Sequence, residues 1–182
     1  MKSMIVGIDT GLVHPAISII DDSGEFIDSF KIDPSTKTSL QHRFTSLSYH
    51  IRNAISKILD HQKFPLYLHT QIVIEMPGFQ SSLKGQKSAE RQDLSKLCAS
   101  FGCILTIFLE FFTPDQISLV TPIEWKGQVP KKVTRMRMKQ RYGELVDSLS
   151  SDQVDGLGIA VYYYENNRAK PVSPGEVTKS PN

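Results

Sequence analysis

The sequence is poor in cysteine and contains no long uninterrupted apolar run. Cys98 and Cys103 lie five residues apart on a segment predicted to be helical, so they point to different faces and cannot form a local zinc pair. We expect both to be buried free thiols. The most apolar stretch, residues 103–112, is interrupted by Glu110 and is much shorter than the roughly 20 residues that span a bilayer. These absences exclude a membrane-spanning helix and a cysteine pair for zinc.

The first residues show little sign of a leader, because a predicted apolar strand begins at Met4 without a charged and apolar region before it. We therefore expect no secretory signal and a cytoplasmic protein. The 182 residues fit one domain, and 40% hydrophobic with 22% charged residues is typical of a soluble globule. We predict a single domain over residues 1–165. Residues 166–182 contain three prolines and no aromatic residue, so we predict a disordered tail there.

Positive charge is concentrated in one part of the chain. The formal net charge at pH 7 is only +2, yet residues 126–141 contain seven cations and no acidic residue, so the rest of the chain is net negative. A solvated surface helix would tolerate this pattern, but it is also the footprint expected of a surface that binds a polyanion. The seven cations are Lys126, Lys131, Lys132, Arg135, Arg137, Lys139 and Arg141.

Hydrophobic periodicity predicts the order βββαβαβα, in which the last strand is followed by the basic helix and then by a final helix. The short connections between the first three strands predict an antiparallel meander, and a right-handed crossover would lay the fourth strand parallel beside the first. We expect strands at residues 4–9, 16–20, 25–32, 71–75 and 117–120, helices at 38–60, 88–112, 131–142 and 151–166, and a loop at 122–130.

Two acidic residues end predicted strands, where charge is usually excluded. Asp9 could simply cap the bend at Thr10 and Gly11. Glu75 shares a strand face with Val73, so it should point either into the core or into a site. Because their strands are predicted to be parallel neighbours, Asp9 and Glu75 should meet at the carboxyl edge of the sheet, where open α/β sheets build ligand sites.

Asp152 and Asp155 open the last predicted helix. The preference of acids for the first turn accounts for Asp152, whereas Asp155 lies one turn further and about 60° round the helix. Gly156 and Gly158 each cost the helix about 1 kcal/mol relative to alanine, so we interpret them as allowing close packing onto the sheet. Four carboxylates gathered there would repel one another unless cations neutralised them, and two Mg²⁺ ions would balance their charge.

Three segments around these acids resemble the acidic motifs of RuvC-type Holliday junction resolvases. They are residues 7–11 (GIDTG), 72–75 (IVIE) and 152–160 (DQVDGLGIA), and the resemblance covers about residues 3 to 164. It implies a ribonuclease H-like fold, with a mixed five-stranded sheet flanked by helices. The segment 121–131 looks more like bacteriophage members than the bacterial enzyme, and Trp125-Lys126-Gly127 departs from the bacterial pattern. The location would then be a bacterial cytoplasm, or that of the host.

The resemblance implies that Asp9, Glu75, Asp152 and Asp155 are catalytic and bind two divalent metals. Such a site hydrolyses a phosphodiester with one ion activating water and the other steadying the leaving oxygen. Oxygen ligands favour Mg²⁺ or Mn²⁺. The family implies 5′-phosphate and 3′-hydroxyl ends, branched DNA as substrate (four-way junctions, with forks and flaps also open) and a symmetric dimer, for which the helix at 88–112 is our candidate interface.

Further residues are candidates for holding DNA. In the loop after Glu75, Phe79 with Lys84 and Lys87 combines aromatic and basic side chains suited to unpaired bases and backbone. A phenylalanine in this loop probes the junction centre in the resembling family, although Phe79 could equally anchor the loop by packing. Cations of the basic segment would contact phosphates. Our candidates there are Lys126, Lys131, Lys132, Arg135 and Lys139.

Two other functions stay open. Sugar-kinase and actin-like nucleotide binders also begin with a strand that ends in an Asp-x-Gly turn, but they need two lobes, for which 182 residues are too few. A nuclease-fold module could bind branched DNA without cutting it, but the presence of all four acids favours an active enzyme.

Overall fold

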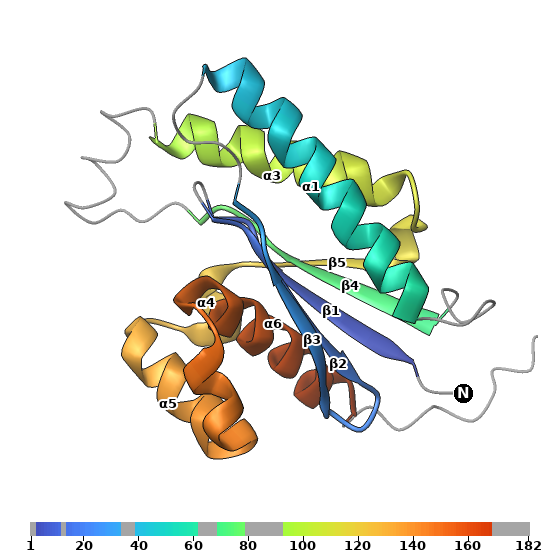
Figure 1. Cartoon of the computed structure of the whole chain (residues 1–182). Coiled ribbons are helices and arrows are strands. Elements are labelled where there is room, and N and C mark those ends of the chain that lie inside the picture. The colour runs from blue at the N-terminus through green and yellow to red at the C-terminus, as the bar shows by residue number, and fades with distance from the viewer. Residues whose placement is uncertain (1–2, 12–13, 34–38, 62–68, 79–92, 169–182) are drawn as a thin grey trace, which may run out of the picture.

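The computed structural model of the chain describes residues 3–11, 14–33, 39–61, 69–78 and 93–168. They form one five-stranded sheet with helices on both faces (Figure 1). The strands are β1 (Met4–Asp9), β2 (Ala16–Asp21), β3 (Phe26–Lys31), β4 (Thr70–Glu75) and β5 (Ile117–Val120). The helices are α1 (Leu40–His61), α3 (Asp93–Leu109), α4 (Pro122–Lys126), α5 (Lys131–Tyr142) and α6 (Ser151–Arg168), with short 3₁₀ helices η2 (Pro114–Gln116) and η3 (Gly143–Ser148).

The strand order is β3-β2-β1-β4-β5. β1, β2 and β3 form the predicted antiparallel meander, while β4 pairs parallel with β1 and β5 pairs parallel with β4. β4 therefore lies beside β1, as the right-handed crossover predicts. The predicted fold class, a mixed five-stranded sheet flanked by helices, is confirmed.

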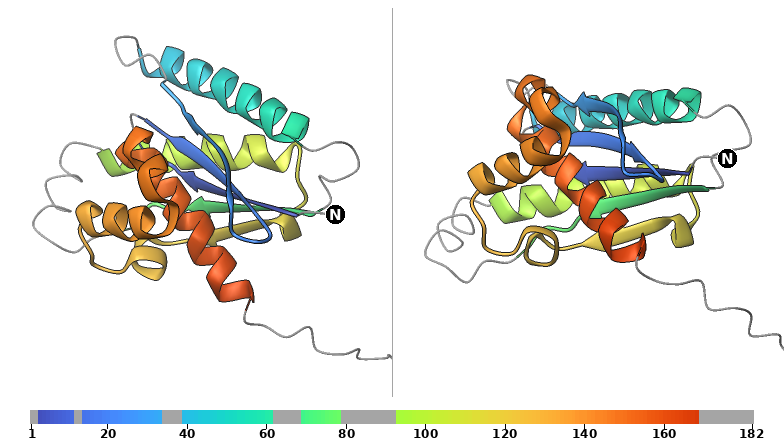
Figure 2. Two further views of the ribbon diagram at one scale, coloured as in Figure 1. Left: turned by 60° about the horizontal axis from the view of Figure 1, so that its bottom comes forward. Right: turned by 90° about the horizontal axis from the view of Figure 1, so that it is seen from below.

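Helices cover both faces of the sheet: α1 and α3 lie on one side, and α4, α5 and α6 on the other (Figures 1 and 2). Alternate β1 residues therefore enter two cores. Val6 and Ile8 belong to the core under α1 and α3, whereas Ile5 packs in the core that includes Leu157 and Val161 of α6. Every residue of β1 is buried, which explains why its sequence is continuously apolar instead of alternating.

Close packing holds α6 against β1 and β2. A Cβ on Gly7 would overlap the carbonyl oxygen of Gly156 and lie 2.6 Å from the backbone nitrogen of Ala160. The Ser18 hydroxyl of β2 donates a 2.8 Å hydrogen bond to the carbonyl oxygen of Gln153. The first turns of α6 are thus fixed at the sheet, and Gly7 belongs with the small residues predicted to permit this approach.

Several predicted boundaries differ from the observed ones. Residues 122–126, predicted as part of a loop, form α4, because Thr121 and Glu124 make a reciprocal capping box and proline occupies the first turn. α3 ends at Leu109, and its predicted residues 88–92 lie outside the described residues. α6 continues to Arg168, past the predicted end, and the remainder of the predicted tail also lies outside them. No described helix is long and apolar enough to cross a membrane.

The prediction of two buried thiols is wrong for Cys98. Both cysteines are free, but Cys98 is exposed and Cys103 is half-buried. α3 buries Ile104, Ile107 and Phe108 against the sheet, and Cys98 lies on the other side of that helix. The apolar character of the segment conceals this difference between its faces.

Candidate active site

Asp9 and Glu75 lie at the carboxyl ends of neighbouring parallel strands, as predicted. The register pairs Ile8 with Ile74, so the two acids follow directly at the same edge of the sheet. The Gly11 backbone N–H donates to Asp9 Oδ1 at 3.1 Å, so Asp9 also caps the bend, as the alternative interpretation proposed. The hydroxyl of Thr10 donates a 2.8 Å hydrogen bond to the carbonyl oxygen of Glu75 and ties the two strand ends together.

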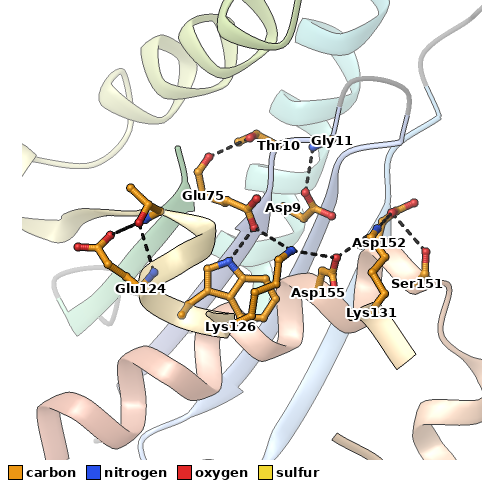
Figure 3. A network of polar contacts seen from close by, with 12 residues as sticks. Asp9, Thr10, Gly11, Glu75, Glu124, Lys126, Lys131, Ser151, Asp152 and Asp155 are labelled. Atoms are coloured by element: carbon orange, nitrogen blue, oxygen red, sulfur yellow. Dashed lines mark hydrogen bonds and ion pairs between the residues drawn. The ribbon is translucent and has the colours of Figure 1, made fainter. Parts of the chain in front are cut away.

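α6 brings Asp152 and Asp155 to the same edge of the sheet (Figure 3). Asp155 is buried, with 2% of its surface exposed, and Asp152 is half-exposed. Lys131, at the start of α5, reaches both: its Nζ lies 3.1 Å from Asp152 Oδ1 and 3.2 Å from Asp155 Oδ2. The sequence prediction that all four acids gather in one place is therefore consistent with this geometry.

α4 holds Glu75 from the other side. The Trp125 indole N–H donates to Glu75 Oε2 at 2.7 Å, and Lys126 Nζ lies 3.9 Å from the same oxygen. Lys126 also lies 3.6 Å from Asp155 Oδ2 and 4.5 Å from the centre of the Trp125 ring. A Cβ on Gly158 would lie only 2.7 Å from that ring, so this glycine makes room for the tryptophan.

Burial and mutual repulsion shift the ionisation of these groups. Burial first, and then the charges of Glu75 and Asp155, raise the pKa of Asp9 to about 7. Burial also raises the pKa of Glu75, although Lys126 and the Trp125 hydrogen bond work against that shift. Burial alone would lower the pKa of Lys131, but the carboxylates of Asp155 and Asp152 hold it above its ordinary value. This edge of the sheet thus carries a cluster of carboxylates in which the ammonium groups of Lys126 and Lys131 provide the positive charge.

The donor set fits a hard divalent cation, because it consists of carboxylate oxygens in a partly buried place. However, no three acidic, histidine or cysteine side chains in the described part of the chain enclose a ready-made metal position. The lysine ammonium groups lie between the carboxylates instead. The chemistry of the residues therefore suits Mg²⁺ or Mn²⁺, while their placement is that of a lysine-neutralised cluster.

The residues predicted to contact DNA differ in their surroundings. Lys126 and Lys131 belong to the acidic cluster, and Lys132 is exposed on α5. Arg135 donates to the carbonyl oxygens of Val146 and Leu149, at 2.8 and 3.0 Å, and so holds η3. Lys139 pairs with Asp147 at 2.7 Å. The remaining candidates, Phe79, Lys84 and Lys87, lie outside the described residues.

Sequence reasoning missed two residues of the site, Thr10 and Trp125. The sequence marks Thr10 only as part of a bend, because its hydrogen bond to β4 depends on the register of the sheet. A signal for Trp125 existed, because the pattern from Thr121 to Glu124 is a capping box that predicts a helix start. That helix is what turns the indole toward Glu75.

Known structures with a similar fold were found by comparison of the coordinates. A Thermus thermophilus RuvC solved with a Holliday junction substrate matches with a TM-score of 0.66 at 14% identity, over 91% of this chain and 95% of that one. Another Thermus thermophilus RuvC structure matches with a TM-score of 0.63 at 14% identity, over 91% and 96%. A fowlpox virus resolvase in complex with Holliday junction DNA gives a TM-score of 0.48 at 14% identity, over 90% and 98%.

Comparison of the sequence alone gives no match, either to a protein-family model or to a curated protein. The resemblance read from the acidic motifs is nevertheless confirmed at the level of the fold, because the structural match extends over nearly the whole length of both chains. The likeness to bacteriophage members stays a prediction. The chain has the ribonuclease H-like fold of RuvC.

Proposed function

We propose that this protein is a metal-dependent endodeoxyribonuclease that resolves Holliday junctions and other branched DNA. The observation that carries the proposal is the meeting of Asp9, Glu75, Asp152 and Asp155 at the carboxyl edge of a RuvC-like sheet. A carboxylate cluster of this kind is suited to two Mg²⁺ or Mn²⁺ ions, which supply an activated water and stabilise the leaving oxygen. One structural neighbour is a RuvC solved with a Holliday junction substrate, which supports branched DNA as the partner.

The chain's own residues have distinct parts in the proposed reaction. Asp9 and Asp155 are the buried carboxylates that would hold the cations, and Asp152 would complete the set from the surface side. Trp125 orients Glu75 by occupying its Oε2, which leaves the other oxygen for a cation. Lys126 and Lys131 supply positive charge where a scissile phosphate would approach.

We also propose a homodimer, since two opposed strands of a junction require two active sites. Leu109 at the end of α3 and Phe111 in the turn after it are exposed, with 45% and 41% of their surface accessible, and they suit a partner surface. Most of the predicted apolar face of α3 is already used by the core, including Ile104 and Phe108. The apolar surface that α3 leaves for a dimer partner is therefore narrower than the sequence pattern predicts.

Cleavage assays test the proposed activity. Four-way junctions, forks and flaps should be cut in Mg²⁺ or Mn²⁺, linear duplex of the same sequence should stay intact, and Ca²⁺ should support binding without cleavage. Asp9→Asn and Glu75→Gln should each lower cleavage at least a thousandfold while junction binding in Ca²⁺ is retained, as expected when a metal-binding carboxylate is lost. Unchanged cleavage by either variant would contradict the assignment.

One observation favours a second function, a module that binds branched DNA without cutting it. The lysines lie between the carboxylates, and the described residues enclose no ready-made metal position. The same assay separates the two functions: tight junction binding with no cleavage in either metal would support the module and exclude the nuclease.

A further inference from the structure

Lys131 bridges two carboxylates of the candidate active site (Figure 3). Its Nζ lies 3.1 Å from Asp152 Oδ1 and 3.2 Å from Asp155 Oδ2. The contact with Asp152 is a hydrogen bond, and both contacts are ion pairs. The ammonium group therefore takes oxygen ligands that the proposed function assigns to a divalent cation.

A positive charge at this position is required whether or not a metal is bound. The Asp155 side chain is 3% exposed, Asp9 is buried beside it, and Glu75 is half-buried. Buried carboxylates without a partner are strongly destabilising. Lys131 meets this need from the surface, since its own side chain is 57% exposed and belongs to a helix bordered by solvent.

Lys126 differs from Lys131 in its freedom to move. Its side chain is only 19% exposed, and its Nζ lies against the Trp125 ring, at 4.5 Å from the ring centre. Its distances to Asp155 and Glu75, 3.6 and 3.9 Å, are also longer. Of the two lysines, Lys131 thus has the shorter bonds to the acids and the open path to solvent.

We propose that Lys131 is a resident counter-cation that exchanges with the catalytic cation. An ammonium group and a divalent cation cannot share the Asp152 and Asp155 oxygens, because their like charges repel at such short distances. Cation binding therefore displaces Lys131, whose ammonium then binds a DNA phosphate beside the site. This inference rests on the proposed function, and it adds that cation loading and junction binding strengthen each other through one side chain.

Calcium affinity tests the exchange without any need for cleavage. Lys131→Met should bind Ca²⁺ roughly tenfold more tightly than the wild type in isothermal titration calorimetry, because no ammonium has to leave. Lys132→Met is the matched control, since it removes the same charge from the next, exposed residue of α5. Its Ca²⁺ affinity should stay within twofold of the wild type. Equal affinities in all three proteins would overturn the proposal.

Junction binding distinguishes exchange from simple repulsion by a nearby charge. The quantity measured is the factor by which Ca²⁺ strengthens binding to a four-way junction, in wild type, Lys131→Met and Lys132→Met. Exchange predicts a factor several-fold smaller in Lys131→Met, because that variant has no released ammonium to deliver to the phosphate. Lys132→Met loses a proposed phosphate contact with and without Ca²⁺ alike, so its factor should equal that of the wild type. If Lys131 merely repelled the cation, the factor in Lys131→Met would equal or exceed that of the wild type.

The two proposals fail in different ways. If the wild type binds no Ca²⁺, or if Asp155→Asn binds Ca²⁺ as tightly as the wild type does, the proposed metal site is excluded, and the exchange is excluded with it. A wild-type protein that binds Ca²⁺ and cuts junctions in Mg²⁺, but shows neither effect of Lys131→Met, would keep the nuclease and overturn the exchange alone.

Discussion

Asp9 combines two roles in one side chain, since it accepts a hydrogen bond from the Gly11 N–H and faces the other carboxylates. Its pKa is about 7 in the folded protein and near 3.8 in an unfolded chain, mainly because of burial. Between these two values the folded state binds a proton that the unfolded state releases. The free energy of unfolding of the metal-free protein should therefore fall as the pH rises from about 4 to about 7.

Asp9→Asn should remove this loss, because an amide does not ionise and its oxygen can still accept from Gly11. In EDTA above pH 7 we expect the variant to melt roughly 10 °C higher than the wild type. The pKa difference of Asp9 corresponds to about 4 kcal/mol, and 1 kcal/mol shifts the Tm of a domain of this size by about 2–4 °C. The difference should shrink as the pH approaches 4. Thermal denaturation across this range measures it, and a gap that does not change with pH would contradict the assigned role of burial.

At the residue scale, the sequence was sufficient for the acids and insufficient for their neighbours. Asp9 and Glu75 could be predicted because each ends an apolar strand, and strand ends are visible in the sequence pattern. The Trp125 indole reaches Glu75 from a distant part of the chain, through a contact that exists only after α4 has packed against α6. Cys98 shows the opposite error, because the general tendency of free cysteines to be buried does not tell which side of α3 faces solvent.

At the scale of elements, the contact between β1 and α6 positions half of the site. Gly7 lies directly against the backbone of Gly156 and Ala160, and neither backbone can move without breaking helix or sheet hydrogen bonds. The motif around Asp9 thus contains a packing requirement as well as a proposed metal ligand. Gly7, two residues before Asp9, determines how closely α6 approaches the sheet, and Asp155 approaches together with that helix.

Gly7→Ala should destabilise the protein by roughly 3 kcal/mol, because the added methyl group overlaps backbone atoms. Gly102→Ala is a suitable control in α3, where a Cβ meets no other described atom within 4 Å. That change should stabilise the protein by about 0.5–1 kcal/mol through helix propensity. Urea denaturation of both variants checks the prediction. Equal free energies of unfolding would show that the close approach of α6 to Gly7 does not contribute to stability.

Elements with strong periodicity were predicted well, and irregular ones were not. The strands and α1 follow simple apolar patterns, so their type and order could be predicted. The short helix α4 has too few residues for a periodic signal, and only its capping box marks it. Helix ends such as Leu109 and Arg168 depend on tertiary packing, which the sequence pattern does not contain.

At the scale of the whole molecule, the sheet separates two surfaces of different character. α4, α5 and α6 lie on the face that carries the concentrated positive charge, and α1 and α3 lie on the other (Figure 1). The cations on the first of these faces have different partners: Arg135 donates to a carbonyl oxygen of η3, and Lys139 pairs with Asp147. Lys132 and Arg137 are exposed on α5 and are better placed for phosphates.

The double variant Lys132→Ala, Arg137→Ala should weaken junction binding and reduce the slope of log K against log salt concentration by about 2, since two phosphate contacts are lost. Lys57→Ala, on α1 at the opposite face, should leave the slope unchanged. Fluorescence anisotropy over a range of salt concentrations measures both slopes. The same slope in the double variant and the wild type would exclude this face of α5 from the DNA surface.

Trp125 is the single tryptophan of the chain, and its indole nitrogen is bonded to Glu75 while Lys126 lies over its ring. Its emission thus comes from one place only. Any rearrangement of charge around Glu75, whether by a cation, a proton or an approaching phosphate, changes the field at that indole. The protein therefore contains an intrinsic optical probe of the candidate active site, and the binding of a cation there can be followed without a label.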